Sequence, residues 1–204
     1  QFRRDFQAIT KFQQIVHSQM IEGHDYGVIP GTGNKPTLLK PGAEKIAKLL
    51  GLADEYDILS EREDWDKPFF RYLIRCRLVS VAHGVTISQG LGECSSMESK
   101  YRWRWVSERD LSPGTDKTKL VSQERSNKTG GRWQVYRVEN DDIYAQVNTI
   151  LKMAKKRALV DAALSAGRLS DLFTQDIEDL RVDQDEPPPQ KLAPTPERRK
   201  APTS

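Results

Sequence analysis

The spacing of hydrophobic residues divides this chain into helical and extended segments. Apolar residues recur at steps of three and four in residues 3–22, 41–50 and 144–176, which predicts three amphipathic helices. Residues 69–81 instead alternate between apolar and polar positions, as a half-buried strand does. Residues 56–65 and 85–94 are predicted as its antiparallel neighbours. The pattern therefore predicts an α+β fold, in which an antiparallel sheet packs on a long helix.

The long helix predicted for residues 144–176 organises the rest of the chain. Its apolar stripe is rich in alanine, and small side chains allow a helix to lie close against a sheet. We therefore expect this helix to pack on the sheet with its cationic side outward. The stripe consists of Val147, Leu151, Ala154, Ala158 and Ala162.

The clearest strand, residues 69–81, separates two kinds of side chain. Its apolar set is expected to face the core, and three arginines follow the other face: Arg71, Arg75 and Arg77. A tight turn at His83 and Gly84 leads into the return strand. On that strand we expect Val85, Ile87 and Leu91 to share the buried face.

Residues 101–140 form an insertion between the sheet and the long helix. Residues 100–106 alternate between aromatic and basic side chains and predict a strand that pairs with residues 132–138 as an inserted β-hairpin. The polar segment 107–131 is expected to be a long mobile loop. We expect residues 1–182 to form one domain and the proline-rich, charged residues 183–204 to form a disordered tail.

Positive charge is concentrated in one part of the chain. The net charge is only +3, but residues 98–157 hold 14 Lys and Arg against 8 Asp and Glu. This asymmetry favours a polyanionic partner for that region. The two cysteines, Cys76 and Cys94, are too few for a four-cysteine zinc site and suit a reducing cytoplasm. We expect no cofactor, no metal and no membrane span, because no apolar run approaches ~20 residues.

The basic side of the long helix has two interpretations. Lysine runs are usually a solvated helix surface. The alternative is a surface that follows a nucleic-acid backbone. Binding a single strand without sequence preference requires cations for phosphates and aromatic faces for bases. The candidate DNA-binding residues of that kind are Lys152, Lys155, Lys156, Arg157, Arg71, Arg75, Arg77, Lys100, Tyr101, Arg102, Trp103 and Arg104.

Each group of candidates also has a structural interpretation. Tyr101, Trp103 and Trp105 could be ordinary core residues, since aromatic side chains are usually buried. The three strand arginines could form ion pairs with acidic residues of a neighbouring strand. The acidic residues expected in those pairs are Glu61, Glu63 and Asp64.

Two segments resemble a known family. The segments GLGECSS (residues 90–96) and KMAKKRALVDAALSA (152–166) resemble the core of the Rad-fifty-two-like single-strand annealing superfamily. The Lys-Arg-Ala-Leu run of that family's helix is matched by residues 156–159, and its preceding short helix by 41–50. LLKPGAEKIAKLLGL and FTQD resemble proteins of phages and mobile elements. The resemblance spans roughly residues 38–176, apart from the insertion.

The resemblance implies a function. In that family, subunits form rings or helical arcs, single-stranded DNA lies in a positive groove between a β-hairpin and the helix, and complementary strands anneal without ATP. Lys156 and Arg157 match the helix motif, whereas Arg75 and Arg77 match only the hairpin as an element. The implied partners are single-stranded DNA, further copies of the chain, and a single-strand binding protein or exonuclease in a bacterial cytoplasm.

Two alternatives belong to other functional classes. A metal-dependent nuclease would need clustered carboxylates, for which Glu61, Glu63, Asp64 and Asp66 are the candidates. A structural accessory protein could instead use the tail to dock a partner. Magnesium-dependent loss of DNA would distinguish the nuclease from an annealing protein.

Overall fold

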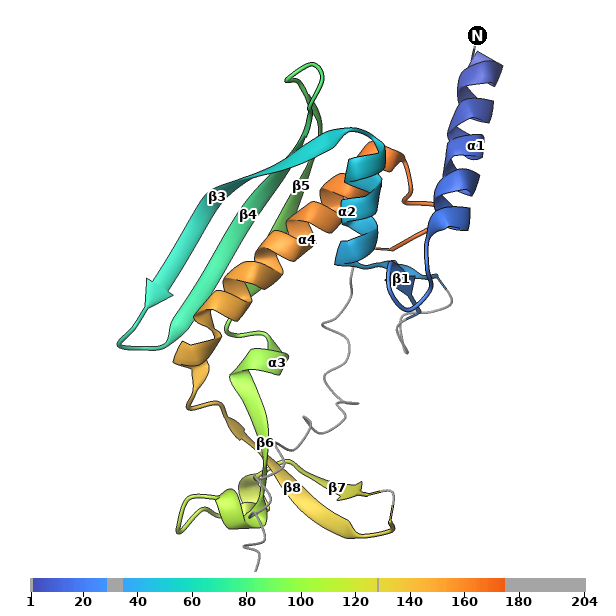
Figure 1. Cartoon of the computed structure of the whole chain (residues 1–204). Helices are drawn as coiled ribbons and strands as arrows, with labels where there is room; N and C mark the ends of the chain where they lie inside the picture. Colours follow the sequence, from blue (N-terminus) through green and yellow to red (C-terminus); the bar gives the residue numbers. More distant parts are fainter. Residues whose placement is uncertain (1, 29–34, 128, 175–204) are drawn as a thin grey trace, which may run out of the picture.

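The computed structural model describes residues 2–28, 35–127 and 129–174, and it has the α+β fold that the hydrophobic pattern predicts. Its centre is an antiparallel three-stranded sheet in the order β3 (Leu52–Asp64), β4 (Phe69–Ser80) and β5 (Thr86–Ser95). The long helix α4 (Val147–Gly167) lies across one face of this sheet, against β4 and β5 (Figure 1). The other face carries no layer of structure in the part of the chain described (Figure 1).

The backbone of α4 packs directly against the backbone of β5. The helix presents its alanine stripe, and Ala154, Ala158 and Ala162 are fully buried. β5 presents Gly90 and Gly92, and a Cβ atom at Gly92 would lie 2.2 Å from the Ala154 carbonyl oxygen and 2.4 Å from the Ala158 nitrogen. The two segments of the family resemblance are therefore the two sides of this contact.

The prediction for the faces of β5 is wrong. Val85, Ile87 and Leu91 are 53%, 52% and 54% exposed, and the buried positions of the strand are Gly90, Gly92 and Cys94. Since side chains alternate along a strand, glycines that face the helix necessarily turn Ile87 and Leu91 to the open face. The prediction from hydrophobicity ignored the glycines and took the face with Val85, Ile87 and Leu91 as the buried face of the strand.

The long helix is also shorter than residues 144–176. It is preceded by a 3₁₀ turn, η3 (Ile143–Gln146), and ends at Gly167. Arg168 adopts a left-handed conformation with φ of 53°, and the Leu169 N–H donates to the Leu164 carbonyl. This turn ends the helix and returns Leu169 and Phe173 to the core, where both are buried.

Further elements complete the main body. Helix α2 (Lys40–Leu49) packs on α4, and a small ribbon of β1 (Tyr26–Gly27) and β2 (Thr37–Leu38) lies beside it. Helix α1 (Phe2–Gln19) projects from the body (Figure 1). Only the end of its predicted apolar stripe is buried, at Val16 and the following Met20, whereas Phe2 and Phe6 are 83% and 69% exposed.

The insertion forms a second small sheet away from the first (Figure 1). Its order is β6 (Trp103–Ser107), β8 (Arg132–Glu139) and β7 (Ser122–Ser126), all antiparallel. The predicted pairing of the first and last of these strands is confirmed. The expectation of an unstructured loop at 107–131 is wrong, because this segment contains β7 and two 3₁₀ turns, η1 (Glu108–Asp110) and η2 (Lys117–Lys119).

The strand predicted from residue 100 begins later than expected. Residues 99–102 form one helical turn, α3 (Ser99–Arg102), and β6 follows it. The Asn140 side chain donates to the Tyr101 carbonyl at 2.9 Å, and the Asn140 N–H donates to the Arg102 carbonyl at 2.8 Å. These bonds join the two connections between the sheets.

Two expectations concern other parts of the chain. None of the described helices combines the length and the apolar character that a membrane span requires. The boundary expected at residue 182 and the tail expected at 183–204 lie outside the described residues.

Candidate nucleic-acid interface

One exposed lysine of α4 lies beside an uncovered strip of β3, and a second lies one turn earlier on the helix. Lys152 and Lys155 are exposed, and the Lys155 Nζ lies 4.1 Å from the centroid of the Tyr56 ring on β3. Tyr56 and Ile58 face the helix side, because they pair with the core residues Cys76 and Ile74 of β4. Ile58 is nevertheless 53% exposed, since α4 lies against β4 and β5. We name these four residues (Lys152, Lys155, Tyr56 and Ile58) the helix–strand ledge.

The ledge combines a cationic row with an aromatic and apolar floor. Lys152 lies one turn before Lys155 on α4. The start of α4 and the end of β3 lie at the same end of the molecule (Figure 1). Burial, reinforced by the neighbouring Asp54, holds the pKa of Tyr56 well above its usual value, so the phenol is neutral. Neither Tyr56 nor Ile58 was identified from the sequence, because their exposure depends on the angle at which α4 crosses the sheet.

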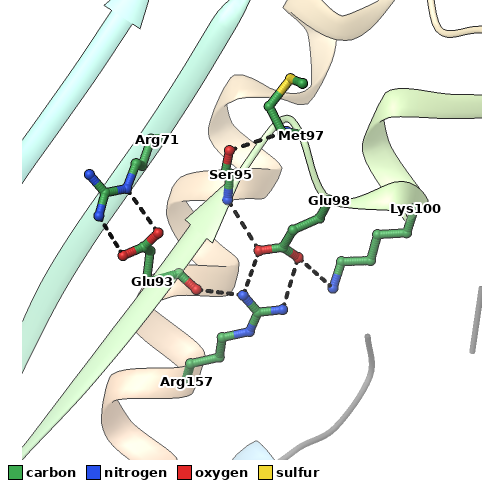
Figure 2. A network of polar contacts seen from close by, with 7 residues as sticks. All are labelled: Arg71, Glu93, Ser95, Met97, Glu98, Lys100 and Arg157. Carbon is green, nitrogen blue, oxygen red and sulfur yellow. Dashed lines mark hydrogen bonds and ion pairs between the residues drawn. The ribbon is translucent and has the colours of Figure 1, made fainter. Parts of the chain in front are cut away.

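The other two basic residues of the helix motif are less accessible. Lys156 is half-buried. The Arg157 guanidinium makes a bidentate ion pair with Glu98, with nitrogen–oxygen distances of 2.7 and 2.9 Å, and also donates to the Glu93 carbonyl (Figure 2). Arg157 therefore attaches α4 to the segment that follows β5. In this conformation the guanidinium is held within the protein rather than presented to a ligand.

The same network includes Lys100. Its Nζ lies 3.6 Å from the Glu98 carboxylate and 5.0 Å from the centroid of the Tyr101 ring (Figure 2). The Glu98 carboxylate also accepts the Ser95 N–H at 3.1 Å. Glu98 thus connects the end of β5, α3 and α4 in one cluster.

Tyr101 is a core residue, which agrees with the structural interpretation of this side chain. It is only 6% exposed and belongs to the main hydrophobic core with Cys94. Because residues 99–102 are helical, Tyr101 does not share the strand alternation of Trp103 and Trp105. Burial also raises the pKa of the Cys94 and Cys76 thiols to about 12, so both remain protonated.

The arginines of β4 lie on the open face of the sheet in ion pairs with adjacent strands. Arg71 holds Glu93 of β5 through two hydrogen bonds of 2.8 and 2.7 Å (Figure 2). Arg75 pairs with Asp57 of β3 at 2.9 Å, and Arg77 pairs with Glu55 and Asp57, each at 3.3 Å. The structural interpretation was that these arginines form ion pairs with acidic residues of a neighbouring strand, and such ion pairs are confirmed.

The acidic partners are not the ones expected. The register of β3 places Glu55 opposite Arg77 and Asp57 opposite Arg75, whereas Glu61 and Glu63 lie opposite Tyr72 and Phe70. A register cannot be read from composition, because it depends on the length of the turn and on the bulge after Ile58. Ion pairs at this level of exposure contribute roughly 0–1 kcal/mol, so a phosphate could compete for the arginines.

The basic residues at the start of the insertion lie on the small sheet. Trp103 is half-buried, with the Arg102 and Arg137 guanidinium carbons 4.8 and 5.1 Å from its ring centroid. Arg102 also pairs with Glu139 at 3.6 Å, and Arg104 pairs with Asp141 at 2.8 Å. The structure thus places the predicted residues at the ledge, in the cluster around Glu98, in the core, on the open sheet face and at the small sheet.

The carboxylates considered for a nuclease make local hydrogen bonds. Glu63 accepts from the Tyr72 hydroxyl and from the Trp65 Nε1 at 3.2 Å. Asp64 accepts the N–H groups of Asp66 and Lys67 at 3.1 and 2.8 Å, which closes the turn between β3 and β4. Among residues 2–28, 35–127 and 129–174, no three His, Cys, Asp or Glu side chains lie close enough together to hold a metal ion.

Comparison of the chain with protein-family models, with curated proteins and with solved structures gives no match. The resemblance to single-strand annealing proteins therefore remains a prediction from the sequence.

Proposed function

We propose that this protein binds single-stranded DNA and anneals complementary strands without ATP, as an oligomer of identical subunits in recombination or repair in a bacterial cytoplasm. The observation that carries the proposal is the helix–strand ledge. There Lys155 lies over Tyr56 of an uncovered strand, Ile58 of that strand is exposed, and Lys152 is exposed one turn earlier on α4.

The chemistry of the ledge suits a single strand. Ammonium groups attract phosphates, and an aromatic or apolar floor provides a surface for unstacked bases. Lys155 already lies over the Tyr56 ring, so one position offers a cation and a π face together. Such a surface discriminates little between base sequences. A protein that anneals arbitrary complementary strands requires this lack of sequence preference.

The arrangement of elements also supports the proposal. The chain has a three-stranded antiparallel sheet packed on a long basic helix, and the segments that resemble the annealing family meet at Gly90, Gly92 and the alanine stripe. The annealing activity, the oligomer and the cellular setting rest on that resemblance. DNA binding rests in addition on the ledge itself.

A salt titration tests the ledge. Each lysine that contacts phosphate contributes roughly −0.7 to the slope of log affinity against log salt for a single strand. Replacing Lys152→Ala and Lys155→Ala together should therefore make the slope shallower by about 1.4 and weaken binding to all base sequences alike. The measurement is fluorescence anisotropy of a labelled oligonucleotide at several salt concentrations.

The matched control removes two exposed helix lysines elsewhere, Lys11→Ala and Lys48→Ala, and should leave the slope unchanged. An unchanged slope for the ledge variant, with an intact circular-dichroism spectrum, would contradict the proposed site. Annealing is measured separately, from the pairing of fluorophore- and quencher-labelled complementary strands without ATP. Magnesium-dependent shortening of the strands in the same mixture would indicate the nuclease instead.

A further inference from the structure

One face of the small sheet gathers three of the four tryptophans of the chain. Residues directly opposite in an antiparallel pair share a face, and the register pairs Trp105 with Arg137 and Trp133 with Arg125. Trp103 lies two residues before Trp105 and therefore on the same side. This Trp–Arg face consists of Trp103, Trp105, Trp133, Arg125 and Arg137.

The arginines of this face lie over the tryptophan rings. Arg137 shares the Trp103 ring with Arg102, and the Arg125 guanidinium carbon lies 5.8 Å from the Trp105 ring centroid. Trp103 and Trp105 are half-buried, and Trp133 is 36% exposed. The Trp103 and Trp105 rings thus have cation–π contacts, and all three rings still present part of their surface to solvent.

These tryptophans do not serve the main core. The described core cluster is formed by the first sheet, the helices and Tyr101, and contains none of the three. Within the small sheet the buried apolar side chains are Val106, Val135 and Tyr136. Partly exposed aromatic rings that alternate with guanidinium groups are the combination that binds single-stranded nucleic acid, because rings stack on bases and arginines contact phosphates.

We propose that the Trp–Arg face is a second contact surface for single-stranded nucleic acid, separate from the helix–strand ledge. The choice of ligand class rests on the proposed function and on charge, since residues 103–139 hold 8 Lys and Arg against 5 Asp and Glu. The Arg102 and Glu139 side chains of the 3.6 Å ion pair are 39% and 72% exposed, so a phosphate can compete with the carboxylate for the guanidinium. The Trp–Arg face provides aromatic rings on which bases stack, and the helix–strand ledge provides lysines.

The test uses variants that change the π face or the charge separately. Trp133→Leu removes the ring and keeps apolar bulk, whereas Trp133→Phe keeps a ring. Arg125→Gln removes one charge from the face. Its matched control is Arg132→Gln on the same small sheet, because Arg132 is opposite Ser126 and points to the other side, where it pairs with Glu124 at 3.4 Å.

Binding is measured by anisotropy of labelled (dT)20 and (rU)20 and by quenching of tryptophan fluorescence with unlabelled strands. Stacking of one base contributes enough that Trp133→Leu should raise Kd by about 5-fold or more. Trp133→Phe should bind within about 3-fold of the unmodified chain, because Phe retains a π face. Arg125→Gln should weaken binding and lower its salt dependence, while Arg132→Gln should change neither.

The outcomes separate this inference from the proposed function. If Trp133→Leu and Arg125→Gln bind both strands as the unmodified chain does, with unchanged circular dichroism, the face is not a binding surface, even if the ledge variant is impaired. If Trp133→Leu fails to fold, the comparison of Arg125→Gln with Arg132→Gln decides alone. If the unmodified chain binds neither strand, both proposals are wrong. Equal binding of (dT)20 and (rU)20 is expected, because stacking does not read the sugar.

Discussion

Gly92 has no side chain because the backbone of α4 occupies the space where a Cβ atom would lie. The carbonyl oxygen of Ala154 and the nitrogen of Ala158 are 2.2 and 2.4 Å from that position, and neither can move without displacing the helix. The same holds for Gly90 against Ala162. At the scale of the residue, the fold thus depends on the absence of side chains at Gly90 and Gly92 of β5 and on the alanines of α4.

Gly92→Ala should therefore destabilise the protein strongly. Overpacking of a tight contact typically costs about 1–3 kcal/mol, and contact with a helix backbone places this change at the upper end. The measurement is the free energy of unfolding from urea denaturation. Gly27→Ala is the control, since a Cβ atom there meets nothing within 4 Å, and it should change stability by less than about 0.5 kcal/mol. Equal stabilities of the two variants would contradict the close contact.

At the scale of elements, α4 has different roles on its different sides. One side packs on the glycines, a second presents Lys152 and Lys155, and Arg157 attaches the helix to α3 through Glu98 (Figure 2). The Lys-Arg-Ala-Leu run that carries the resemblance thus includes Arg157 in an ion pair and Ala158 in the tightest packing. In this chain the contacts that hold α4 against β5 and Glu98 largely explain the run.

Arg157→Gln tests that role. The Arg157 and Glu98 side chains are only 16% and 22% exposed, and hydrogen bonds between charged groups contribute about 1.5–3 kcal/mol. We expect the free energy of unfolding to fall by about 2 kcal/mol, with little change in the salt dependence of DNA binding. Lys152→Gln, an exposed position of the same helix, should show the opposite pattern. If Arg157→Gln has normal stability and a shallower slope of log DNA affinity against log salt, Arg157 belongs to the DNA-binding site.

At the scale of the whole molecule, two of the exposed apolar surfaces lie on α1 and on β5. The first turns of α1 expose Phe2, Phe6 and Ile9, and the open face of β5 exposes Ile87 and Leu91. Exposed apolar patches often mark surfaces for association. Because these two surfaces differ, a contact between α1 of one copy and the sheet of the next would be head-to-tail, and such contacts generate rings or filaments.

We therefore expect self-association that depends on α1. Phe6→Ser with Ile9→Ser should shift the mass measured by light scattering at micromolar protein from oligomer to monomer, because it removes the exposed apolar stripe. The change should leave circular dichroism nearly unaltered, since both side chains lie at or near the surface. Gln7→Ser with Gln14→Ser, on the opposite side of the same helix, should leave the oligomer intact. A monomeric mass for the unmodified chain, with single-stranded DNA present, would argue against assembly.

The sequence by itself determined the elements and much of their order. Periodicity placed β4 and the body of α4 because these segments have one polar and one apolar side, and alanine spacing predicted the close helix–sheet contact. Tertiary structure alone decided the face of β5, the end of α4 at Gly167 and the burial of Tyr101. Each depends on contacts between residues far apart in the chain, which local hydrophobicity does not encode. The ledge and the Trp–Arg face arise in the same way, since the crossing of α4 uncovers β3 and strand register brings the tryptophans together.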